Sequence, residues 1–236
     1  MKRPQVHKAN ADQATYWSGA AGLRWIARQE TLDIVLEPIQ AILSERAAVA
    51  TGERVIDVGC GCGASSIALA RRVGPTGRVT GVDISAPMLA RARQQAPADL
   101  PLEFVLADAT VHPFEPGAAD LLVSRFGVMF FADPVVSFRN MRNGLRPGGR
   151  VTFACWRALD LNPWMHLPLL EALKHVAAPP RWGPDEPGPF AFAREERVRG
   201  ILEGAGYSAV GMEAVGLALD LAAGKGLEAA VWGALA

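Results

Sequence analysis

A short apolar run followed by three alternating glycines constrains this chain more than any other feature. Residues 54–58 read RVIDV, and a run of this length with β-branched residues is typical of a strand buried on both faces. Gly59, Gly61 and Gly63 follow, and residues 64–72 then have the spacing of a helix. Glycine lets the backbone approach a ligand closely, and the first turn of a helix has unpaired amide donors. The sequence therefore predicts a strand, a glycine turn and a helix N-terminus that together bind a nucleotide-like ligand.

Two classes of cofactor are bound by such a turn, and Asp57 distinguishes between them. Residues 59–64 also satisfy the pattern G-x-G-x-x-[GA], so an NAD(P)-dependent oxidoreductase is an alternative. A carboxylate at position 57 would repel a pyrophosphate, whereas it suits an ammonium group or the amides of the turn. S-adenosylmethionine carries an ammonium and a sulfonium group and has no phosphate. Asp57 therefore favours S-adenosylmethionine, unless its carboxylate only pins the glycine turn.

Strand-like and helix-like stretches alternate through the middle of the chain. The candidate strands are residues 54–58, 78–82, 102–106, 120–124 and 150–156. This alternation predicts an α/β fold with a doubly wound, mostly parallel sheet and helices on both faces. In such sheets the ligand binds at the carboxyl ends of the strands.

Polar residues stand where successive candidate strands end. Asp83 lies about 20 residues after the glycines, the spacing at which a carboxylate binds the two hydroxyls of a ribose. Asp108 follows the third strand, where an acid can accept the exocyclic amine of an adenine or can cap a turn in a loop. Ser124 and Arg125 end the fourth strand. Because the carboxyl ends of parallel strands share one edge, we expect these side chains to converge there with Asp57.

The flanks of this region are less regular. Residues 1–45 are expected to form an N-terminal helical cap over the ligand, with residues 1–15 polar and without fixed structure. Residues 46–236 are expected to form the cofactor-binding domain, with a loop and helix insertion at about residues 157–193. A strand-like run near residues 210–219 is a candidate sixth strand.

Composition and charge argue against several classes of function. The formal net charge is zero, which gives no indication of nucleic acid or an anionic membrane surface as a binding partner. No apolar run approaches the roughly 18 residues that span a bilayer, and the first residues lack a signal-peptide pattern. Three cysteines make neither a disulfide framework nor a four-cysteine zinc site, so no metal is expected. The sequence therefore predicts a cytoplasmic protein.

The ordered motifs over residues 50–156 resemble the class I S-adenosylmethionine-dependent methyltransferases, in particular small-molecule enzymes of the "methyltransferase type 11" kind. The motifs are VIDVGCGCG, GVDIS, ADAT, DLLVSRFGVMFFADP and LRPGGRVTF. The resemblance implies a Rossmann-like methyltransferase fold, with S-adenosylmethionine as methyl donor and S-adenosylhomocysteine as product. The cofactor-binding residues then expected are Asp57, Gly59, Cys60, Gly61, Gly63, Asp83, Ile84, Asp108, Ala109, Ser124, Arg125 and Phe126.

The resemblance also implies a role for each part of this set. The glycine turn would hold the methionyl part of the cofactor and Asp83 its ribose. Asp108 and Ala109 would meet the adenine, with Ile84 packed on its ring. At the position of Arg125 the family usually contacts the cofactor through the backbone, which leaves the role of the guanidinium open.

The end of the chain departs from the family pattern. The family's sheet closes with an antiparallel hairpin, and here no clear seventh strand follows the candidate sixth. We therefore expect an open edge beside residues 151–156, either because the sequence is incomplete at its C-terminus or because another element takes that place.

The methyl acceptor is predicted to be a small, partly hydrophobic metabolite. Candidate acceptor-binding residues are Trp25, Met129, Phe130 and His166, although the apolar ones suit a core equally well. Transfer from a sulfonium is an in-line displacement that requires mainly proximity and orientation. A general base would come from His112, His166 or His175, and no catalytic residue is assigned. A non-catalytic S-adenosylmethionine-binding protein is a second alternative to the enzyme.

Overall fold

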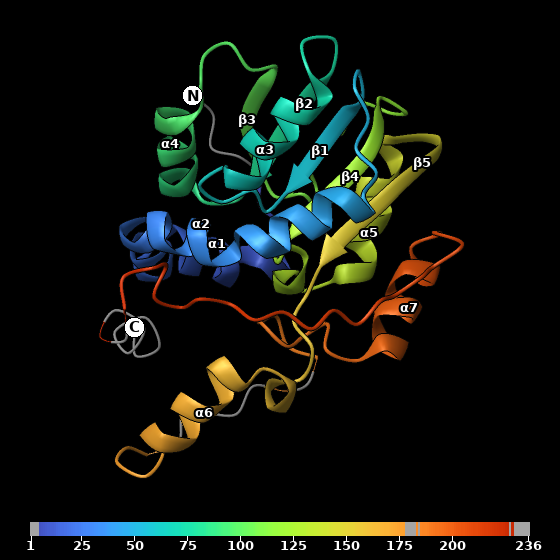
Figure 1. Ribbon diagram of the computed structural model, residues 1–236. Helices are drawn as coiled ribbons and strands as arrows, with labels where there is room; N and C mark the ends of the chain where they lie inside the picture. Colours follow the sequence, from blue (N-terminus) through green and yellow to red (C-terminus); the bar gives the residue numbers. More distant parts are fainter. Residues whose placement is uncertain (1–4, 178–182, 184, 227, 229–236) are drawn as a thin grey trace.

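Five parallel strands in the order β3-β2-β1-β4-β5 form the centre of the protein (Figure 1). The computed structural model describes residues 5–177, 183, 185–226 and 228. The strands are β1 (Arg54–Val58), β2 (Arg78–Asp83), β3 (Leu102–Leu106), β4 (Ala119–Arg125) and β5 (Leu145–Ala154). The helices between them are α3 (Ala64–Val73), α4 (Ala86–Gln95) and α5 (Pro134–Asn143), with the short 3-10 helix η2 (Val128–Phe130) after β4. The α/β fold with a parallel, doubly wound sheet that the sequence predicts is confirmed.

Both faces of the sheet are covered by apolar side chains, which explains why the central strands are apolar without alternation. On one face Val55 and Leu121 of the strands pack with Leu69 of α3. On the other face the neighbouring residues, such as Leu122, pack with Phe138 of α5 and with α7 (Glu195–Gly204). Successive side chains of a strand point to opposite faces, so each strand contributes to both clusters.

The N-terminal helices lie across the carboxyl ends of the strands (Figure 1). They are η1 (Lys8–Asn10), α1 (Ala11–Ser18) and α2 (Ala20–Arg46). The expectation that residues 1–15 lack fixed structure is wrong for residues 8–15, because these form η1 and the start of α1. The physical reason is Asn10, which is 3% exposed and finds its partners in distant loops that no local pattern reveals.

The sheet ends at β5, which pairs only with β4 in the described part of the chain. Its register shifts between Ala119 and Leu121, so that residues 146–149 form an irregularity at the start of the strand. The sixth strand expected near residues 210–219 is not formed, because this segment has no regular structure and no strand partner. Gly211 and Gly216 interrupt its apolar pattern, and a strand without a ladder partner gains little from alternation alone. The open edge expected beside residues 151–156 is therefore present among the described residues.

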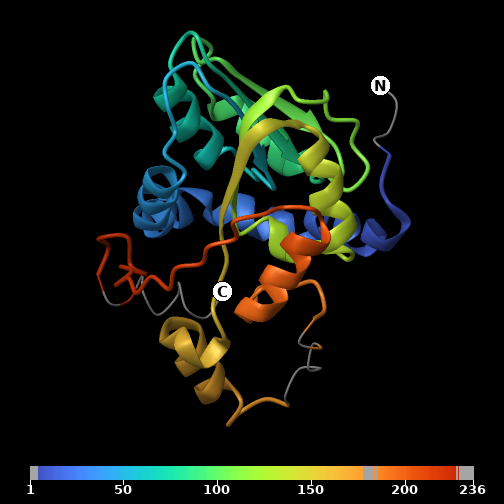
Figure 2. The same cartoon turned by 90° about the vertical axis from the view of Figure 1, so that its right-hand side faces the viewer.

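Residues 157–177, after β5, form a separate arm. It holds the 3-10 helix η3 (Leu159–Leu161) and α6 (Pro163–Ala172), and Figures 1 and 2 show α6 standing apart from the sheet. The expected insertion at about residues 157–193 contains these two elements, while residues 178–182 and 184 lie outside the described part. Across the described residues, every helix is too short or too polar to pass through a lipid bilayer.

Candidate functional site

The glycine turn after β1 is fixed by close backbone packing. Gly59, Gly61 and Gly63 have φ angles of +66°, +55° and +88°, a region that glycine enters without strain. A Cβ on Gly59 would lie 2.6 Å from the Cα of Gly127, in the loop after β4. The two loops therefore touch backbone to backbone, and this contact holds the turn at the carboxyl edge of the sheet.

Asp57, at the end of β1, is fully buried. Its Oδ2 accepts hydrogen bonds from the hydroxyls of Ser65 and Ser66, both at 2.6 Å, in the first turn of α3. Its Oδ1 has no hydrogen-bond partner among the described residues. Burial raises the pKa of Asp57 to about 6, although the two serines and the charge of Arg125 act against the rise. A buried carboxylate oxygen without a donor is costly, so Oδ1 is an acceptor suited to a cationic ligand.

Asp83, at the end of β2, joins the glycine turn to the start of α4. Its carboxylate accepts hydrogen bonds from the backbone amides of Gly61 at 2.7 Å and Ser85 at 2.8 Å. Burial raises its pKa, and these amide donors oppose the rise. The hydroxyl of Ser85 donates in turn to the carbonyl of Trp17 at 2.7 Å, so the N-terminal helices are anchored beside Asp83. Ile84, between the two residues, is half-buried.

Asp108, after β3, is held by the N-terminal segment. Its carboxylate accepts from the amide of His7 at 2.9 Å and from Asn10 Nδ2 at 3.0 Å to each oxygen. It also accepts from the amide of Thr110 at 2.9 Å, which is the turn-capping contact that the sequence leaves open. The side-chain carbonyl of Asn10 accepts from the amide of Ala132 at 3.0 Å. Asn10 thus links the loops after β3 and β4, while an adenine contact of Asp108 stays a prediction. Ala109 beside it is buried.

The residues at the end of β4 shape the neighbouring loop. The hydroxyl of Ser124 donates to the carbonyl of Val58 at 2.7 Å and accepts from the amide of Gly127 at 3.2 Å. Phe126 has a φ angle of +66°, an uncommon conformation for a residue with a side chain. Its ring stacks on Trp156, with centroids 4.2 Å apart and an interplanar angle of 10°. These contacts fix Phe126 between the glycine turn and the end of β5.

Arg125 lies on the same face of the sheet as Asp57. Asp57 pairs with Val123, two residues before Arg125, and side chains two residues apart on a strand share a face. The side chain of Arg125 is 10% exposed, and its nearest acid is Asp33 of α2, at 3.8 Å from Nη2 to Oδ1. Burial lowers the pKa of Arg125, while Asp33 and Asp57 raise it. A positive group is therefore enclosed beside the buried carboxylate.

The candidate acceptor-binding residues fall into separate places. Trp25 and Phe130 both contact Trp17, with ring centroids 6.2 and 4.9 Å apart, close to the anchored N-terminal helices. Met129 is 1% exposed and belongs to the core cluster of α5 and α7. His166 belongs to α6, a helix that stands away from the sheet (Figure 1). The structure therefore brings Trp25 and Phe130 together and does not bring His166 to them.

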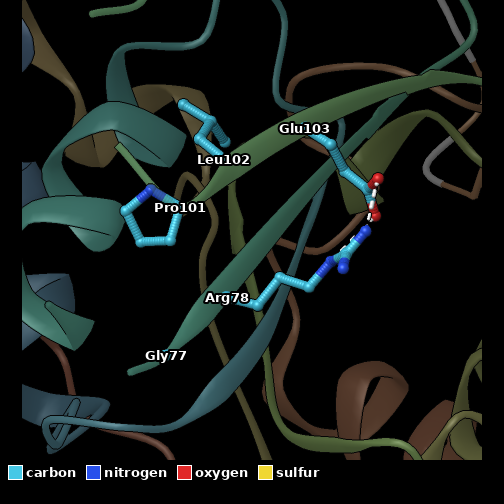
Figure 3. A pocket seen from close by; sticks show the side chains of 5 residues that line it. All are labelled: Gly77, Arg78, Pro101, Leu102 and Glu103. Atoms are coloured by element: carbon cyan, nitrogen blue, oxygen red, sulfur yellow. Dashed lines mark hydrogen bonds and ion pairs between the residues drawn. The ribbon is translucent and has the colours of Figure 1, made fainter. Parts of the chain in front are cut away.

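The other candidate bases also lie away from the edge that carries the glycine turn. His112 is half-buried, its pKa is lowered by burial, and its ring lines a hollow at the amino ends of the strands. The side chain of His175 is 74% exposed beside Glu171. A second hollow at the amino ends, of about 250 Å³, is lined by Gly77, Arg78, Pro101, Leu102 and Glu103 (Figure 3). An ion pair of Arg78 and Glu103 crosses it at 2.7 Å, and the acids of the candidate site lie at the opposite edge.

Several residues of this edge have no role in the sequence prediction. They are Asn10, Asp33, Ser65, Ser66 and Gly127. Ser65 and Ser66 could have been found from the sequence, because two adjacent hydroxyls stand in the first turn of the helix after the glycines. For the other three, only their contacts in space reveal them. Cys60, within the turn, is buried, and burial raises its thiol pKa well above the ordinary value.

The strand order, the glycine turn and the acids that close successive strands define the class of this protein. In these features the chain is similar to the class I S-adenosylmethionine-dependent methyltransferases. A profile of the family described as "Methyltransferase domain" matches residues 55–149. S-adenosylmethionine is the methyl donor of this class, and S-adenosylhomocysteine is the product.

Particular relatives agree with this assignment. The demethylmenaquinone methyltransferase of Staphylococcus aureus is 38% identical over 103 residues, which cover 44% of this chain and 43% of that relative. The match thus spans less than half the length of the curated relatives. A solved S-adenosylmethionine-dependent methyltransferase from Aquifex aeolicus has a TM-score of 0.52 at 18% identity, covering 71% of this chain and 78% of that one. Phosphoethanolamine N-methyltransferase 2 from Haemonchus contortus, in complex with S-adenosyl-L-methionine, has a TM-score of 0.50 at 20% identity, covering 72% and 36%. At these identities, the solved structures show a shared fold.

Proposed function

We propose that this protein binds S-adenosylmethionine at the carboxyl edge of its sheet and transfers the methyl group to a small, partly hydrophobic acceptor. The observation that carries the proposal is the buried Oδ1 of Asp57, an acceptor without a donor beside the glycine turn. A pyrophosphate would place negative charge against this carboxylate, whereas the ammonium group of S-adenosylmethionine would supply the missing donor. The NAD(P)-dependent alternative is therefore disfavoured.

The residues at the edge suit the other parts of the cofactor. Asp83 is held by two backbone amides and retains lone pairs with which to accept the ribose hydroxyls. Ile84 follows it, where a half-buried apolar side chain can pack on the adenine. The proposed cofactor-binding set is Asp57, Gly59, Cys60, Gly61, Gly63, Asp83, Ile84, Asp108, Ala109, Ser124, Arg125 and Phe126. Within this set, Asp108 would have to share its carboxylate with Asn10 or exchange Asn10 for the adenine amine.

In the proposed reaction the protein contributes position more than chemistry. The bound cofactor supplies an electrophilic methyl group on a sulfonium, which an acceptor attacks in line. The glycine turn fixes one side of the site, and the stacked rings of Phe126 and Trp156 hold the β4 loop in place on another. The N-terminal helices cover the edge and exclude water. Neither His112 nor His175 is assigned as a base, because both lie away from the edge that carries the glycine turn.

The acceptor is proposed to bind beside the aromatic cluster of Trp17, Trp25 and Phe130. Aromatic side chains with little polar surface favour a ligand with an apolar part. The name of the Staphylococcus aureus relative supports a small-molecule acceptor over a macromolecule. The domain division into a cap of residues 1–45 and a cofactor domain of residues 46–236 is part of this proposal, and a cytoplasmic location stays a prediction.

Binding measured by calorimetry tests the proposal. We expect the protein to bind S-adenosylhomocysteine with a micromolar-range affinity and to show no heat with NADH at the same concentrations. Tight binding of NADH without binding of S-adenosylhomocysteine would contradict the proposal. A screen of small acceptors with radiolabelled S-adenosylmethionine then separates enzyme from sensor, since binding without any transfer would favour the non-catalytic alternative.

The cap depends on Asn10, and its loss is expected to open the cap without unfolding the sheet. Asn10→Ala removes the donors to Asp108 and the acceptor for Ala132, and each lost buried hydrogen bond costs about 1–3 kcal/mol. Hydrogen exchange over residues 7–18 should accelerate at least about 10-fold. The matched control is Asn162→Ala, which removes another buried asparagine that bonds only within its own loop. Equal exchange over residues 7–18 in both variants would show that Asn10 does not hold the cap.

A further inference from the structure

The arm of residues 157–177 exposes apolar side chains that the rest of the described chain leaves uncovered (Figures 1 and 2). α6 has no buried residue, and its main packing partner is η3, within the arm itself. Five large apolar side chains of the arm are between 37% and 63% exposed: Leu161, Leu167, Leu170, Leu173 and Val176. A helix that is apolar on all sides is normally buried, and a helix of only ten residues is marginal on its own in water. The arm therefore requires an apolar partner.

Four apolar residues of the arm form one ridge, here called the α6 ridge. They are Trp164, Leu167, Leu170 and Leu173, spaced three residues apart, and residues at this spacing are neighbours on a helix surface. The ridge is about 14 Å long, at about 1.5 Å of rise per residue. Asn162 fixes its near end, because its Nδ2 donates to the carbonyls of Arg157 and Ala158 at 3.0 and 2.9 Å. A long, narrow apolar surface suits a linear chain better than a compact ring system.

The α6 ridge is continuous with the candidate site. The ring of Trp164 lies 5.3 Å from the ring of Trp156, which stacks on Phe126 at 4.2 Å. Phe126 follows β4 and belongs to the core cluster against which Trp25 and Phe130 also pack. An apolar path therefore leads from the aromatic residues of the proposed acceptor site to the ridge.

We propose that the methyl acceptor carries a long, linear apolar chain, which lies along the α6 ridge while its reacting group binds beside Trp25 and Phe130. This inference rests on the proposed function and names the chemical class of its acceptor. The ridge lies outside residues 55–149, the segment that the family profile matches, so it belongs to this chain and not to the shared part of the domain.

The charges of the arm argue against a membrane surface as the occupant of the ridge. A helix that lies on an anionic membrane carries lysines and arginines on its polar face, whereas α6 contains neither. Lys174, just after α6, is paired with Glu171 at 2.5 Å. A second copy of the chain would cover the leucines, but it would not account for the aromatic path that joins them to the site.

The binding of alcohols of increasing chain length tests the inference. Hexanol, octanol, decanol and dodecanol are titrated into the complex with S-adenosylhomocysteine, and tryptophan fluorescence reports binding. In the unchanged protein the affinity should rise about 2- to 4-fold with each added methylene group. The double variant Leu167→Ser, Leu170→Ser should lose most of this rise, while its affinity for hexanol stays within about threefold, because a short chain does not extend along the ridge.

Two further variants show that the loss reflects polarity of the ridge. The double variant Leu167→Met, Leu170→Met keeps the apolar surface and should keep the dependence on chain length. Val136→Ser, at an exposed valine of α5, is the matched control away from the arm and should also keep it. Circular dichroism compares the helix content of all variants.

The outcomes separate this inference from the proposed function. If the unchanged protein binds S-adenosylhomocysteine but shows no dependence on chain length, the inference fails and cofactor binding stands. The same holds if the double serine variant keeps the dependence. If sedimentation velocity shows that the serine substitutions convert a dimer into a monomer, the ridge is a contact between two copies and the inference is overturned. If the unchanged protein does not bind S-adenosylhomocysteine, the proposed function itself fails.

Discussion

Replacing Gly59 by alanine is expected to destabilise the fold by about 3 kcal/mol or more. The new Cβ would lie 2.6 Å from the Cα of Gly127, and a backbone atom cannot swing aside as a side chain can. Both loops would have to separate, which would move the amides of the glycine turn. Urea unfolding monitored by circular dichroism gives the free energy of unfolding for the comparison.

Gly117 provides a matched control for this prediction. Its φ angle is +67°, against +66° for Gly59, but no atom lies within 4 Å of an added Cβ. Gly117→Ala therefore has the same left-handed strain without the collision, and it should cost only about 1 kcal/mol. Equal costs at the two positions would show that strain alone explains the glycines and that the contact between the two loops has no energetic weight.

The contact of Gly59 with Gly127 also shows where sequence reasoning reaches its limit. The spacing of the three glycines predicts a turn that lets a ligand approach, and the turn is present. The need for glycine at position 59 nevertheless comes from a loop 68 residues later in the sequence, as the numbers 59 and 127 show. Local patterns report which backbone angles a segment favours, whereas they do not report what another segment places against it.

The same distinction explains the rest of the fold. Short apolar runs predict all five strands, and burial on both faces explains this local signature in the central strands β1 and β4. Residues 210–219 have a similar signature and form no strand, since a strand also requires an edge in register with it. Asn10 is the opposite case. A polar residue near a terminus predicts exposure, but Asp108, Thr110 and Ala132 supply partners from loops that fold next to it.

The candidate site divides in the same way. Asp57, Asp83 and Arg125 are predictable because each closes a strand and parallel strands share their carboxyl edge. Their protonation and pairing are not predictable from position. Burial, with only the two serines of α3 as donors, raises the pKa of Asp57 to about 6. Arg125 is buried too, and its nearest acid, Asp33 at 3.8 Å, comes from α2. The sequence locates the carboxyl edge of the sheet, but it does not predict how the helices pack over that edge.

Asp57→Asn is expected to weaken the binding of S-adenosylhomocysteine at pH 7.5 by roughly 100-fold, because an amide cannot pair with an ammonium group as a carboxylate does. The pH dependence should identify the cause. In the unchanged protein the carboxyl group ionises at a pKa of about 6, so affinity should rise as the pH increases through 6. In Asp57→Asn this rise should disappear. Calorimetric titrations between pH 5 and pH 8 measure it.

The stability of the unchanged protein should fall over the pH range in which its ligand affinity rises. The pKa of Asp57 is about 6 when folded against an ordinary value of 3.8, so between these values the folded protein holds a proton that the unfolded chain has released. Its contribution to stability is therefore complete below about pH 4 and declines as the pH rises to 6, by about 3 kcal/mol in total. Asp57→Asn should abolish that decline. Asp57→Asn must be compared with the unchanged protein, because Asp83 also has a raised pKa and remains in both proteins.

Asp120→Asn, at the amino end of β4, is the control, because the pKa of Asp120 is shifted in the opposite direction. The amide of Arg54 and the side chain of Arg146 lower the pKa of Asp120, so its stabilisation is present above pH 4 and lost as the pH falls further. This substitution should lower stability at neutral pH and leave cofactor affinity unchanged. If a carboxylate that is costly to bury is what binds the cation, then ligand affinity should rise and stability should fall over the same interval of increasing pH. If Asp57→Asn removed only one of these two trends, the carboxylate that is costly to bury would not be the group that binds the cofactor.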